Sequence, residues 1–331
     1  MAKRKSNRSK ALTKAQRHLV FNTQDSVSGL YYIDTARQLS KVNRKLFRQS
    51  YCYGIESAEI YFANQVGAAQ SVLVEMQVAP DNWVVNNAHV KGEALFHEMQ
   101  RLVLDDNPSV KGKWADYKVF LDSGHRSAFF GGGELEVVDG DNVVFLNGEW
   151  SHSRYVLPQH DVDPVTGLPL PADETQAHLL GPDVGIPGAL QSVGLVKAYQ
   201  DSRARVFDNS PNTPAAFATS FFTALTDSGS QEPELAGVIQ AENEDPPYDV
   251  DAYPGSAANN GGVPSSVAIT TANVNAPVGY MGSFIAPCGL IRLKVTGFDV
   301  NGAPTTAPAM TLKLNLMAGD YKGIAAIPMG Q

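Results

Sequence analysis

Histidines and carboxylates that lie close together in the sequence are the first residues to test for chemistry. His152, His160, Asp161 and Asp163 form one such group. Their spacing matches no zinc-binding motif. Prolines crowd the stretch that follows, which is typical of a surface loop. We therefore expect ordinary polar loop residues at these four positions.

A second group, His89, His97 and Glu98, falls in a segment with helical periodicity. The two histidines are eight residues apart and do not form the H-E-x-x-H motif of zinc proteases. We expect these side chains to face solvent or to cap the helix. The sequence also lacks a G-x-S-x-G motif and a cysteine with a convincing histidine partner. It therefore predicts no catalytic residues, no resident cofactor or metal, and no enzyme.

Glycines 131 to 133 call for the same test, because glycine-rich loops bind phosphate. Glu134 and Leu135 follow them, without the Lys-Ser or Lys-Thr pair and without a helix start. The motif thus fails as a phosphate loop, and a sharp turn between two strands is the better interpretation. Cys52 and Cys288 are the two cysteines, too few for a disulfide scaffold or a cysteine zinc cluster. We expect both to be buried small side chains in a reducing compartment.

An acidic cluster near residue 245 offers oxygen ligands at high density. Carboxylates in a flexible loop can bind Ca²⁺, here at contacts between subunits, although the EF-hand spacing is missing. A solvated acidic loop is the simpler interpretation, and both stay open. The cluster consists of Glu242, Glu244, Asp245, Asp249 and Asp251.

The N-terminal segment is the strongest functional signal. Residues 1–17 contain seven basic residues, no acidic residue and almost nothing to bury, so they predict a flexible arm, which we bound at residues 1–20. Such an arm neutralises phosphates without a fixed geometry, which predicts nucleic-acid binding that is independent of base sequence. A localisation signal and a charged solubility tail remain alternatives. The expected contacts are Lys3, Arg4, Lys5, Arg8, Lys10, Lys14 and Arg17.

A second basic group follows at spacings of 4, 3, 1 and 3 residues. On a helix its members fall within an arc of roughly 100°, opposite Leu39, Val42 and Leu46, so the segment predicts a helix with a basic face. A solvated helix face and a strand are the alternatives. We expect weaker nucleic-acid contacts from Arg37, Lys41, Arg44, Lys45 and Arg48.

Charge divides the chain into a basic head and an acidic body. Residues 1–55 carry a net charge of +10 and the remaining residues −18, which gives −8 overall. Arg205 and Arg292 bound a stretch without any Lys or Arg. One end of the chain therefore attracts polyanions, and the body repels them.

The rest of the pattern predicts an all-β domain with one inserted helix. The helix is expected at residues 88–104, and Met310–Met317 alternates apolar and polar residues with the period of a strand. Residues 157–190 and 227–264 are rich in Pro, Gly and acid and predict long surface loops. No run of about 18 apolar residues indicates a membrane span, and no secretory signal is expected. The other expected strands are residues 58–62, 71–78, 117–121, 134–138, 143–146, 192–199, 267–271 and 289–298.

The start of the chain resembles the capsid proteins of circular Rep-encoding single-stranded DNA (CRESS-DNA) viruses. The resemblance lies in Tyr31-Tyr32-Ile33-Asp34, in the run from Leu39 to Gln49 and in the segment from Tyr51 to Phe62. It is specific over residues 1–62 and architectural beyond them.

The resemblance implies a single viral jelly roll of two packed four-stranded antiparallel sheets, formed by residues 21–331. It implies self-assembly into an icosahedral shell that encloses the single-stranded DNA genome, with the arm inside and the acidic region 208–251 facing outward. It places the chain in the virion, after synthesis in the host cytoplasm and import into the nucleus. The host receptor stays open.

Two other classes of protein remain as alternatives. One is a β-sandwich module that recognises carbohydrate or a receptor through its long loops; the basic arm argues against it. The other is an enzyme on a β-sandwich, for which His152, His160 and Asp161 are the candidates.

Overall fold

The computed structural model describes residues 14–23, 29–62, 69–112, 114–157, 173–186, 189–204 and 263–330. Several predictions from the sequence lie outside these ranges. They concern the arm residues from Lys3 to Lys10, the loop residues His160, Asp161 and Asp163, and the acidic region 208–251 with its proposed Ca²⁺ ligands.

The first sheet is built around a long central strand, β3, which pairs antiparallel with every other strand that it contacts. The strand that carries the clearest alternation in the sequence, β15, lies between β3 and the first strand of the chain. The first sheet consists of β1 (His18–Asn22), β15 (Met310–Leu316), β3 (Tyr51–Phe62), β11 (Val278–Met281), β12 (Phe284–Ala286) and β16 (Ala326–Pro328).

The second sheet is also antiparallel, with β13 at its centre. β13 contacts β2 along one edge and β4 along the other, and β4 pairs with β10 at the sheet margin. The second sheet consists of β2 (Gly29–Asp34), β13 (Leu290–Phe298), β4 (Ser71–Val78), β10 (Ser265–Asn273) and the short β14 (Pro304–Thr305).

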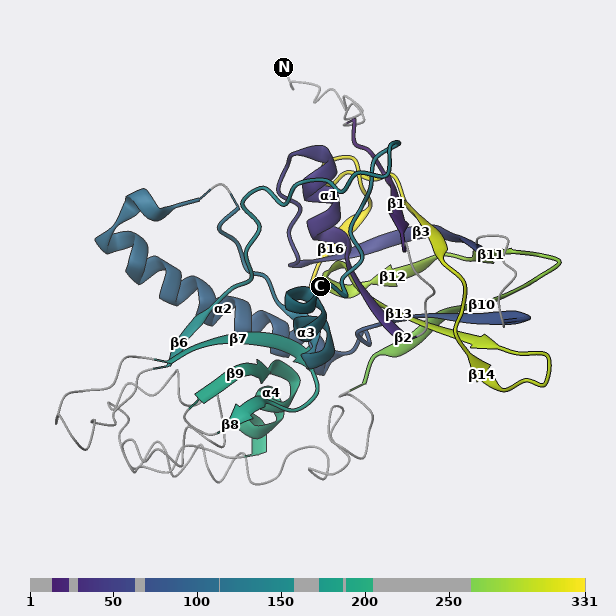
Figure 1. Ribbon diagram of the computed structural model, residues 1–331. Helices are drawn as coiled ribbons and strands as arrows, with labels where there is room; N and C mark the ends of the chain where they lie inside the picture. Colours follow the sequence, from purple (N-terminus) through teal and green to yellow (C-terminus); the bar gives the residue numbers. More distant parts are fainter. Residues whose placement is uncertain are drawn as a thin grey trace, which may run out of the picture.

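The two sheets share one hydrophobic core, which explains the alternation in their sequences. Leu312 and Ile60 from the first sheet and Val74 and Leu293 from the second are fully buried in the same cluster. Successive side chains of a strand point to opposite faces, so every second residue reaches this core. The described chain is mostly β-sheet without a closed barrel, and the pair of sheets is compatible with a β-sandwich. We call it the two-sheet body (Figure 1).

The connection from β4 to β10 contains a second, mixed unit, which we call the inserted unit. A third sheet with parallel pairs β5·β7 and β7·β9 forms its base, and α2 extends away from it (Figure 1). Its elements are α2 (Trp83–Asp106), the 3₁₀ turn η1 (Pro108–Val110), β5 (Phe120–Asp122), α3 (Ser123–Gly131), β6 (Tyr155–Leu157), β7 (Asp173–Leu180), β8 (Val184–Ile186), β9 (Ala189–Gly194) and α4 (Leu195–Ala204).

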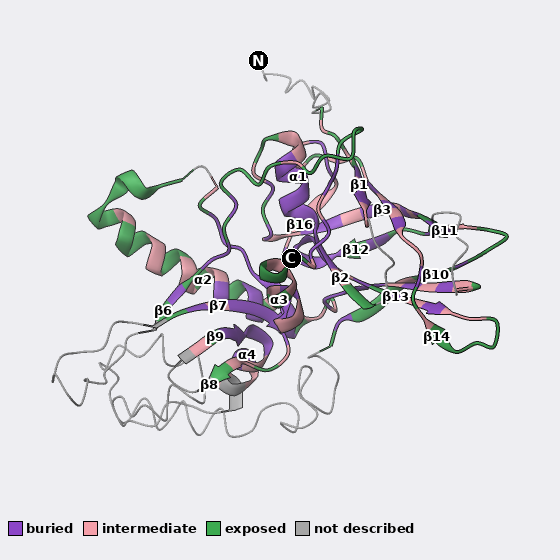
Figure 2. Cartoon of the chain, viewed as in Figure 1, coloured by how far each residue is buried: buried purple, intermediate pink, exposed green. Residues whose placement is uncertain are grey.

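A second core joins the inserted unit to the two-sheet body. It combines residues of α2, β7 and α4 with Tyr32, Cys52 and Cys288 of the body. The first turns of α2 are buried there, whereas its far end is exposed (Figure 2). Both cysteines are free, and both are buried, as expected from the sequence. None of the helices in the described residues is long and apolar enough to cross a membrane.

The prediction of a single helix is wrong. The helix expected at 88–104 is confirmed as α2, and the basic segment after residue 34 begins with a helix, α1 (Thr35–Asn43), as its spacing predicts, but α3 and α4 are helical as well. The strand expected at 192–199 ends at Gly194, where α4 begins. Leu195, Ala198 and Tyr199 are buried at the spacing of a helix, which a short apolar run cannot distinguish from a strand.

Two predicted boundaries are wrong. Residues 18–20 do not belong to a flexible arm, because they begin β1 and pair with β15. Residues 157–190 are not one long surface loop, because β7, β8 and the start of β9 lie within them.

Two further expectations need correction. The glycines after residue 130 do not join two strands, because Gly132 adopts φ 79° and closes the C-terminus of α3. The segments 134–138 and 143–146 form isolated bridges instead of regular strands. A turn from Asp139 to Asn142 lies between them, closed by the hydrogen bond from Asn142 N–H to the Asp139 carbonyl, 3.1 Å.

The shared core predicts a large difference between buried and exposed aliphatic positions. We expect Leu312→Ala to lower the free energy of unfolding by about 2–5 kcal/mol, because it removes buried methyl groups and leaves a cavity. The matched control is Ile269→Ala on β10, an exposed strand position expected to change it by less than about 1 kcal/mol. Urea denaturation of the full chain measures both, and equal losses would contradict this core.

Candidate nucleic-acid interface

The structure separates the predicted basic group of residues 37–48 into a buried pair and an exposed set. Arg37 and Lys41 lie on α1 and are 2% and 1% exposed. Arg37 Nη1 lies 2.7 Å from Glu134 Oε2, and its Nη2 lies 2.8 Å from Glu136 Oε1. Lys41 pairs with the same Glu136. Both cations are therefore neutralised in the interior, and the prediction that they contact nucleic acid is wrong.

The N-terminus of α1 explains how these charges are held. Asp34 caps the helix, with Oδ1 accepting from Arg37 N–H at 2.9 Å and Oδ2 accepting from Gln49 Nε2 at 2.7 Å. Burial, with the nearby Glu134 charge, raises the pKa of Asp34 to about 7. Burial and the Arg37 charge lower the pKa of Lys41 to about 7. α1 therefore carries a buried, closely coupled charge network at its first turns.

The predicted helical basic face is also wrong in extent, because α1 ends before the last three cations. Arg44 adopts φ 53° and forms the C-cap, so Lys45 and Arg48 belong to the segment that leads to β3. Arg44 and Lys45 are exposed. Arg48 is 55% exposed, and its Nε lies 2.7 Å from Asp116 Oδ2. These three side chains stay at the surface, as the sequence predicts, but not on a helix.

The root of the N-terminal segment lies against the same end of α1. Gln16 N–H donates to Asn43 Oδ1 at 2.8 Å, and Asn43 Nδ2 donates back to the Gln16 carbonyl at 3.1 Å. Arg17 Nη1 donates to the Leu316 carbonyl at 3.3 Å. Lys14 is exposed beside this clamp. The clamp thus brings the last two cations of the predicted arm to the exposed end of α1.

Lys322 also lies near this exposed end of α1, and this position was not predicted from the sequence. Its Nζ donates to the Leu46 carbonyl and lies 5.3 Å from the centre of the Tyr321 ring. Tyr321 in turn accepts a hydrogen bond from Arg48 N–H at 3.0 Å. Burial, followed by the Arg48 charge, lowers the pKa of Lys322. A lone lysine some 275 positions away from this segment gives no signal in sequence.

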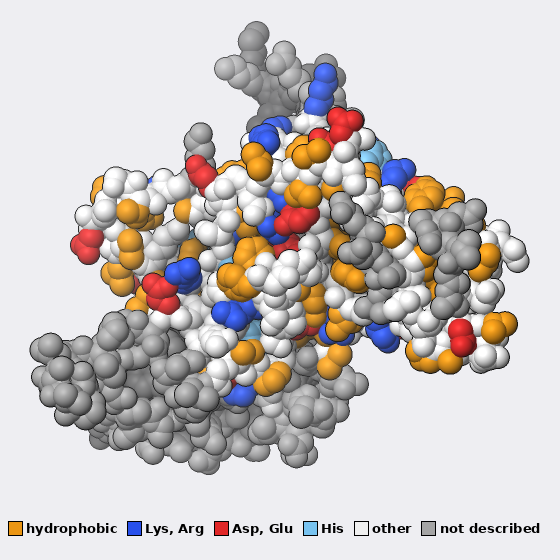
Figure 3. Space-filling model, in the orientation of Figure 1, with side chains coloured by type: hydrophobic (Ala, Val, Ile, Leu, Met, Phe, Trp, Pro, Cys, Tyr) orange, Lys and Arg blue, Asp and Glu red, His pale blue; other side chains and the backbone are white. Residues whose placement is uncertain are grey.

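We call this surface the basic end. Figure 3 shows Lys and Arg side chains at the top of the molecule, near the start of β1. Of the six residues named at the end of this paragraph, only Arg48 forms an ion pair with a described residue. The other five cations are therefore available to a mobile polyanion. Its chemistry suits phosphate neutralisation, which needs charge and no fixed donor geometry. The basic end consists of Lys14, Arg17, Arg44, Lys45, Arg48 and Lys322.

The histidines considered for catalysis lie elsewhere and in different surroundings from those predicted. His152 is buried and stacks on Phe120, with ring centroids 3.8 Å apart, so it is not a polar loop residue. His89 is fully buried on α2, contrary to the expectation of solvent exposure, whereas His97 is half-exposed. Glu98 pairs with Arg101 at 2.6 Å and not with either histidine.

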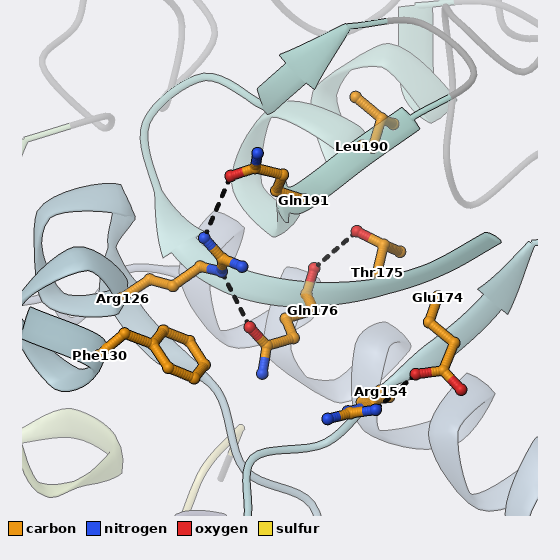
Figure 4. A pocket seen from close by; sticks show the side chains of 8 residues that line it. All are labelled: Arg126, Phe130, Arg154, Glu174, Thr175, Gln176, Leu190 and Gln191. Carbon is orange, nitrogen blue, oxygen red and sulfur yellow. Dashed lines mark hydrogen bonds and ion pairs between the residues drawn. The ribbon is translucent and has the colours of Figure 1, made fainter.

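A groove of about 310 Å³ lies on the inserted unit (Figure 4). Arg126 Nε donates to Gln176 Oε1 at 2.8 Å, and the side chain lies over Phe130. Arg154 pairs with Glu174 at 2.6 Å. An exposed aromatic ring beside amide and guanidinium groups is a surface that suits a polar ligand.

Comparison with known proteins leaves the family undetermined, since no family model, curated protein or solved structure matches this chain.

The buried network predicts an asymmetry between buried and exposed ion pairs. We expect Glu134→Gln to lower the free energy of unfolding by roughly 3 kcal/mol, because Arg37 would lose its buried counter-charge. The matched control is Glu174→Gln, which breaks an exposed pair and should cost less than about 1 kcal/mol. Urea denaturation at neutral pH measures both. Similar values for the two variants would show that the interior pair is not what holds α1.

The buried histidines predict destabilisation by acid. Burial lowers the pKa of His125 to about 3, and the unfolded value is near 6.5, so below pH 6.5 the unfolded chain takes up a proton that the folded chain refuses. The contribution of His125 to stability is thus lost as the pH falls from about 6.5 to 3. Asp34 acts in the opposite direction between about pH 4 and 7.

The test is the slope of unfolding free energy against pH in wild type and in His125→Asn. Asn keeps an acceptor for the Leu121 N–H, which His125 Nδ1 accepts at 3.0 Å, but does not titrate. We expect the variant to remove about 1.4 kcal/mol per pH unit from the wild-type slope between pH 6 and 4. Parallel slopes in the two proteins would exclude His125 as the acid-sensitive group.

Proposed function

We propose that this chain is a viral capsid protein that self-assembles into an icosahedral shell and encloses a nucleic-acid genome. The observation that carries the proposal is the basic end, which gathers surface cations where a strongly basic N-terminal segment joins the two-sheet body. A shell protein needs such a surface on one side only, because its genome lies on one side. The acidic composition of the remaining chain fits an opposite, outward side.

The strand order supports a viral jelly roll. When β11 and β12 are counted as one strand and the short β14 and β16 are left out, eight strands remain in the two-sheet body. The first pairs with the eighth and the second with the seventh, as β1·β15 and β2·β13. They pair third with sixth and fourth with fifth, as β3·β11 and β4·β10. This is the order obtained when one long hairpin is rolled up, and jelly rolls of this kind form many viral capsids. The inserted unit then occupies the loop between the fourth and fifth strands.

Self-assembly has a further source of support in exposed apolar side chains. Ile269 on β10, Tyr280 on β11 and Ile285 on β12 are each at least half exposed. Apolar side chains that gather on a protein surface are typical of contacts with other chains. We propose that neighbouring copies of the chain cover them in the shell.

The proposed binding is independent of base sequence, because the basic end contacts phosphates. A single-stranded DNA genome, a place in the virion and passage through the host nucleus follow from the resemblance to CRESS-DNA virus capsid proteins. Lysine and arginine contacts to phosphate do not distinguish DNA from RNA.

A binding module is the second candidate, and the groove beside Phe130 is the observation that favours it. Its polar lining suits a carbohydrate or a receptor loop. This function predicts a monomer or small oligomer that contains no nucleic acid. Negative-stain microscopy of the recombinant chain, with the 260/280 nm absorbance ratio of the same fraction, distinguishes the two. Uniform spherical particles with a raised ratio support the capsid, and a monomer in every buffer contradicts it.

The roles of the arm and the basic end are tested by changing their charges separately. One variant replaces the seven basic residues of the arm by Gln, and a second carries Arg44→Gln, Lys45→Gln and Lys322→Gln. We expect both to form particles that hold less nucleic acid than wild type. For single-stranded DNA bound to the free chain, the slope of log affinity against log salt concentration should become shallower by ~0.7 for each phosphate that the variant no longer neutralises.

The control carries Lys111→Gln, Lys294→Gln and Lys313→Gln, which remove the same charge from other surfaces. It should package like wild type. If the arm variant packages normally, the arm does not bind the genome. If the control loses as much nucleic acid as the basic-end variant, total charge and not position decides packaging.

A further inference from the structure

One face of α2 carries His89, Glu93 and His97 at intervals of one helical turn. The segment before β5 places Asp116 opposite this face. One ligand atom from each of Glu93, His97 and Asp116 lies within 4.8 Å of the others. Neither the predicted nucleic-acid contacts nor the groove beside Phe130 uses these side chains.

Glu93 is the centre of this group. Its Oε1 accepts a hydrogen bond from Ser50 Oγ at 2.6 Å and lies 3.6 Å from His97 Nε2. Its Oε2 lies 3.9 Å from His89 Nδ1. Glu93 is thus held by the body on one side and lies between two imidazoles of its own helix.

His89 provides an independent observation. It is 0% exposed, and neither ring nitrogen has a hydrogen-bond partner among the described residues. Buried polar groups are nearly always satisfied, so an unsatisfied imidazole that faces a carboxylate calls for an explanation. A neutral imidazole carries one ring N–H, and Nδ1 of His89 is placed to present it to Glu93.

We propose that Glu93, His97 and Asp116 bind one divalent transition-metal ion, with Zn²⁺ as the best match, and that His89 orients Glu93. One imidazole and two carboxylates form a mixed nitrogen and oxygen donor set, which suits Zn²⁺ better than Ca²⁺. His89 then donates from Nδ1 to the Glu93 oxygen that faces it, as outer groups do around metal-binding carboxylates. Three protein ligands leave the fourth position of a tetrahedral ion open to solvent.

The geometry permits this ion after small side-chain rotations. Tetrahedral Zn²⁺ with bonds of about 2.0–2.1 Å sets its ligand atoms roughly 3.3 Å apart, so the three atoms must approach by up to about 1.5 Å. His97 is 47% exposed and Glu93 25% exposed, which leaves them room to move. Asp116 is the fixed member, because it is buried and its Oδ1 accepts a hydrogen bond from the Tyr117 N–H at 3.0 Å.

Arg48 competes with the ion for Asp116. Its Nε lies 2.7 Å from Asp116 Oδ2, so a bound cation would replace the guanidinium as the partner of this carboxylate. Removing the Arg48 charge should therefore strengthen metal binding. A purely structural role for the three residues predicts no such gain.

The experiment titrates the full chain, stripped with EDTA, with Zn²⁺ in an isothermal calorimeter. We expect one site per chain, and at least about tenfold weaker binding in His97→Ala and in Glu93→Gln. Arg48→Gln should bind several-fold more tightly. His18→Ala and Glu98→Gln are matched controls, an exposed histidine and a glutamate outside the group, and should bind like wild type. Co²⁺ in place of Zn²⁺ should give the visible absorption of a tetrahedral site.

Three results would overturn the proposal. The first is wild-type binding weaker than ~100 µM. The second is unchanged affinity in both His97→Ala and Glu93→Gln, with folding verified by circular dichroism. The third is Ca²⁺ bound as tightly as Zn²⁺. The titration uses protein freed of nucleic acid, so a failure of the metal site is distinguishable from a failure of the proposed capsid function.

Discussion

A guanidinium cannot remain charged inside a protein without a counter-charge, and the Arg37–Glu134 pair meets this constraint at the junction of the two units. Glu134 follows α3 of the inserted unit, and Arg37 lies on α1 of the body. The pair therefore fixes α1 and the segment after α3 in one arrangement. It also turns the first half of α1 inward, so that in the described segment from α1 to β3 the exposed cations begin at Arg44.

Strand pairing determines which distant residues join that surface. The first strand of the body lies beside the last long one, so the root of the N-terminal segment runs next to Leu316. The turn that follows the same strand carries Lys322 back to Leu46. A basic surface built from three separate segments thus follows from antiparallel pairing and burial. Repulsion between the like charges of this surface opposes folding, and bound phosphates would reduce that repulsion.

Elements with a long and regular periodicity were predicted correctly from the sequence. Predictions were wrong where a residue's contacts lie far away along the chain. β4 has the predicted limits because its eight residues alternate, and α2 extends the predicted helix by a few residues at each end. A helical wheel showed Arg37 and Lys41 on one face but not that this face meets carboxylates about 95 residues later. The parallel pairs of the third sheet and the place of Lys322 depend on long-range contacts in the same way.

If the chain encloses a genome, as proposed, the buried pair also changes the charge balance inside the shell. Glu134 and Glu136 neutralise Arg37 and Lys41, and Asp116 engages Arg48, so the segment after β2 contributes fewer free cations than its composition suggests. In the proposed shell, most of the phosphate neutralisation would then depend on the arm, while the basic end would position the nucleic acid at the root of the arm. Asp116 stands between the two proposed roles of this region. A metal ion on Asp116 would release Arg48 to the phosphates, and by linkage a polyanion on Arg48 would favour the ion.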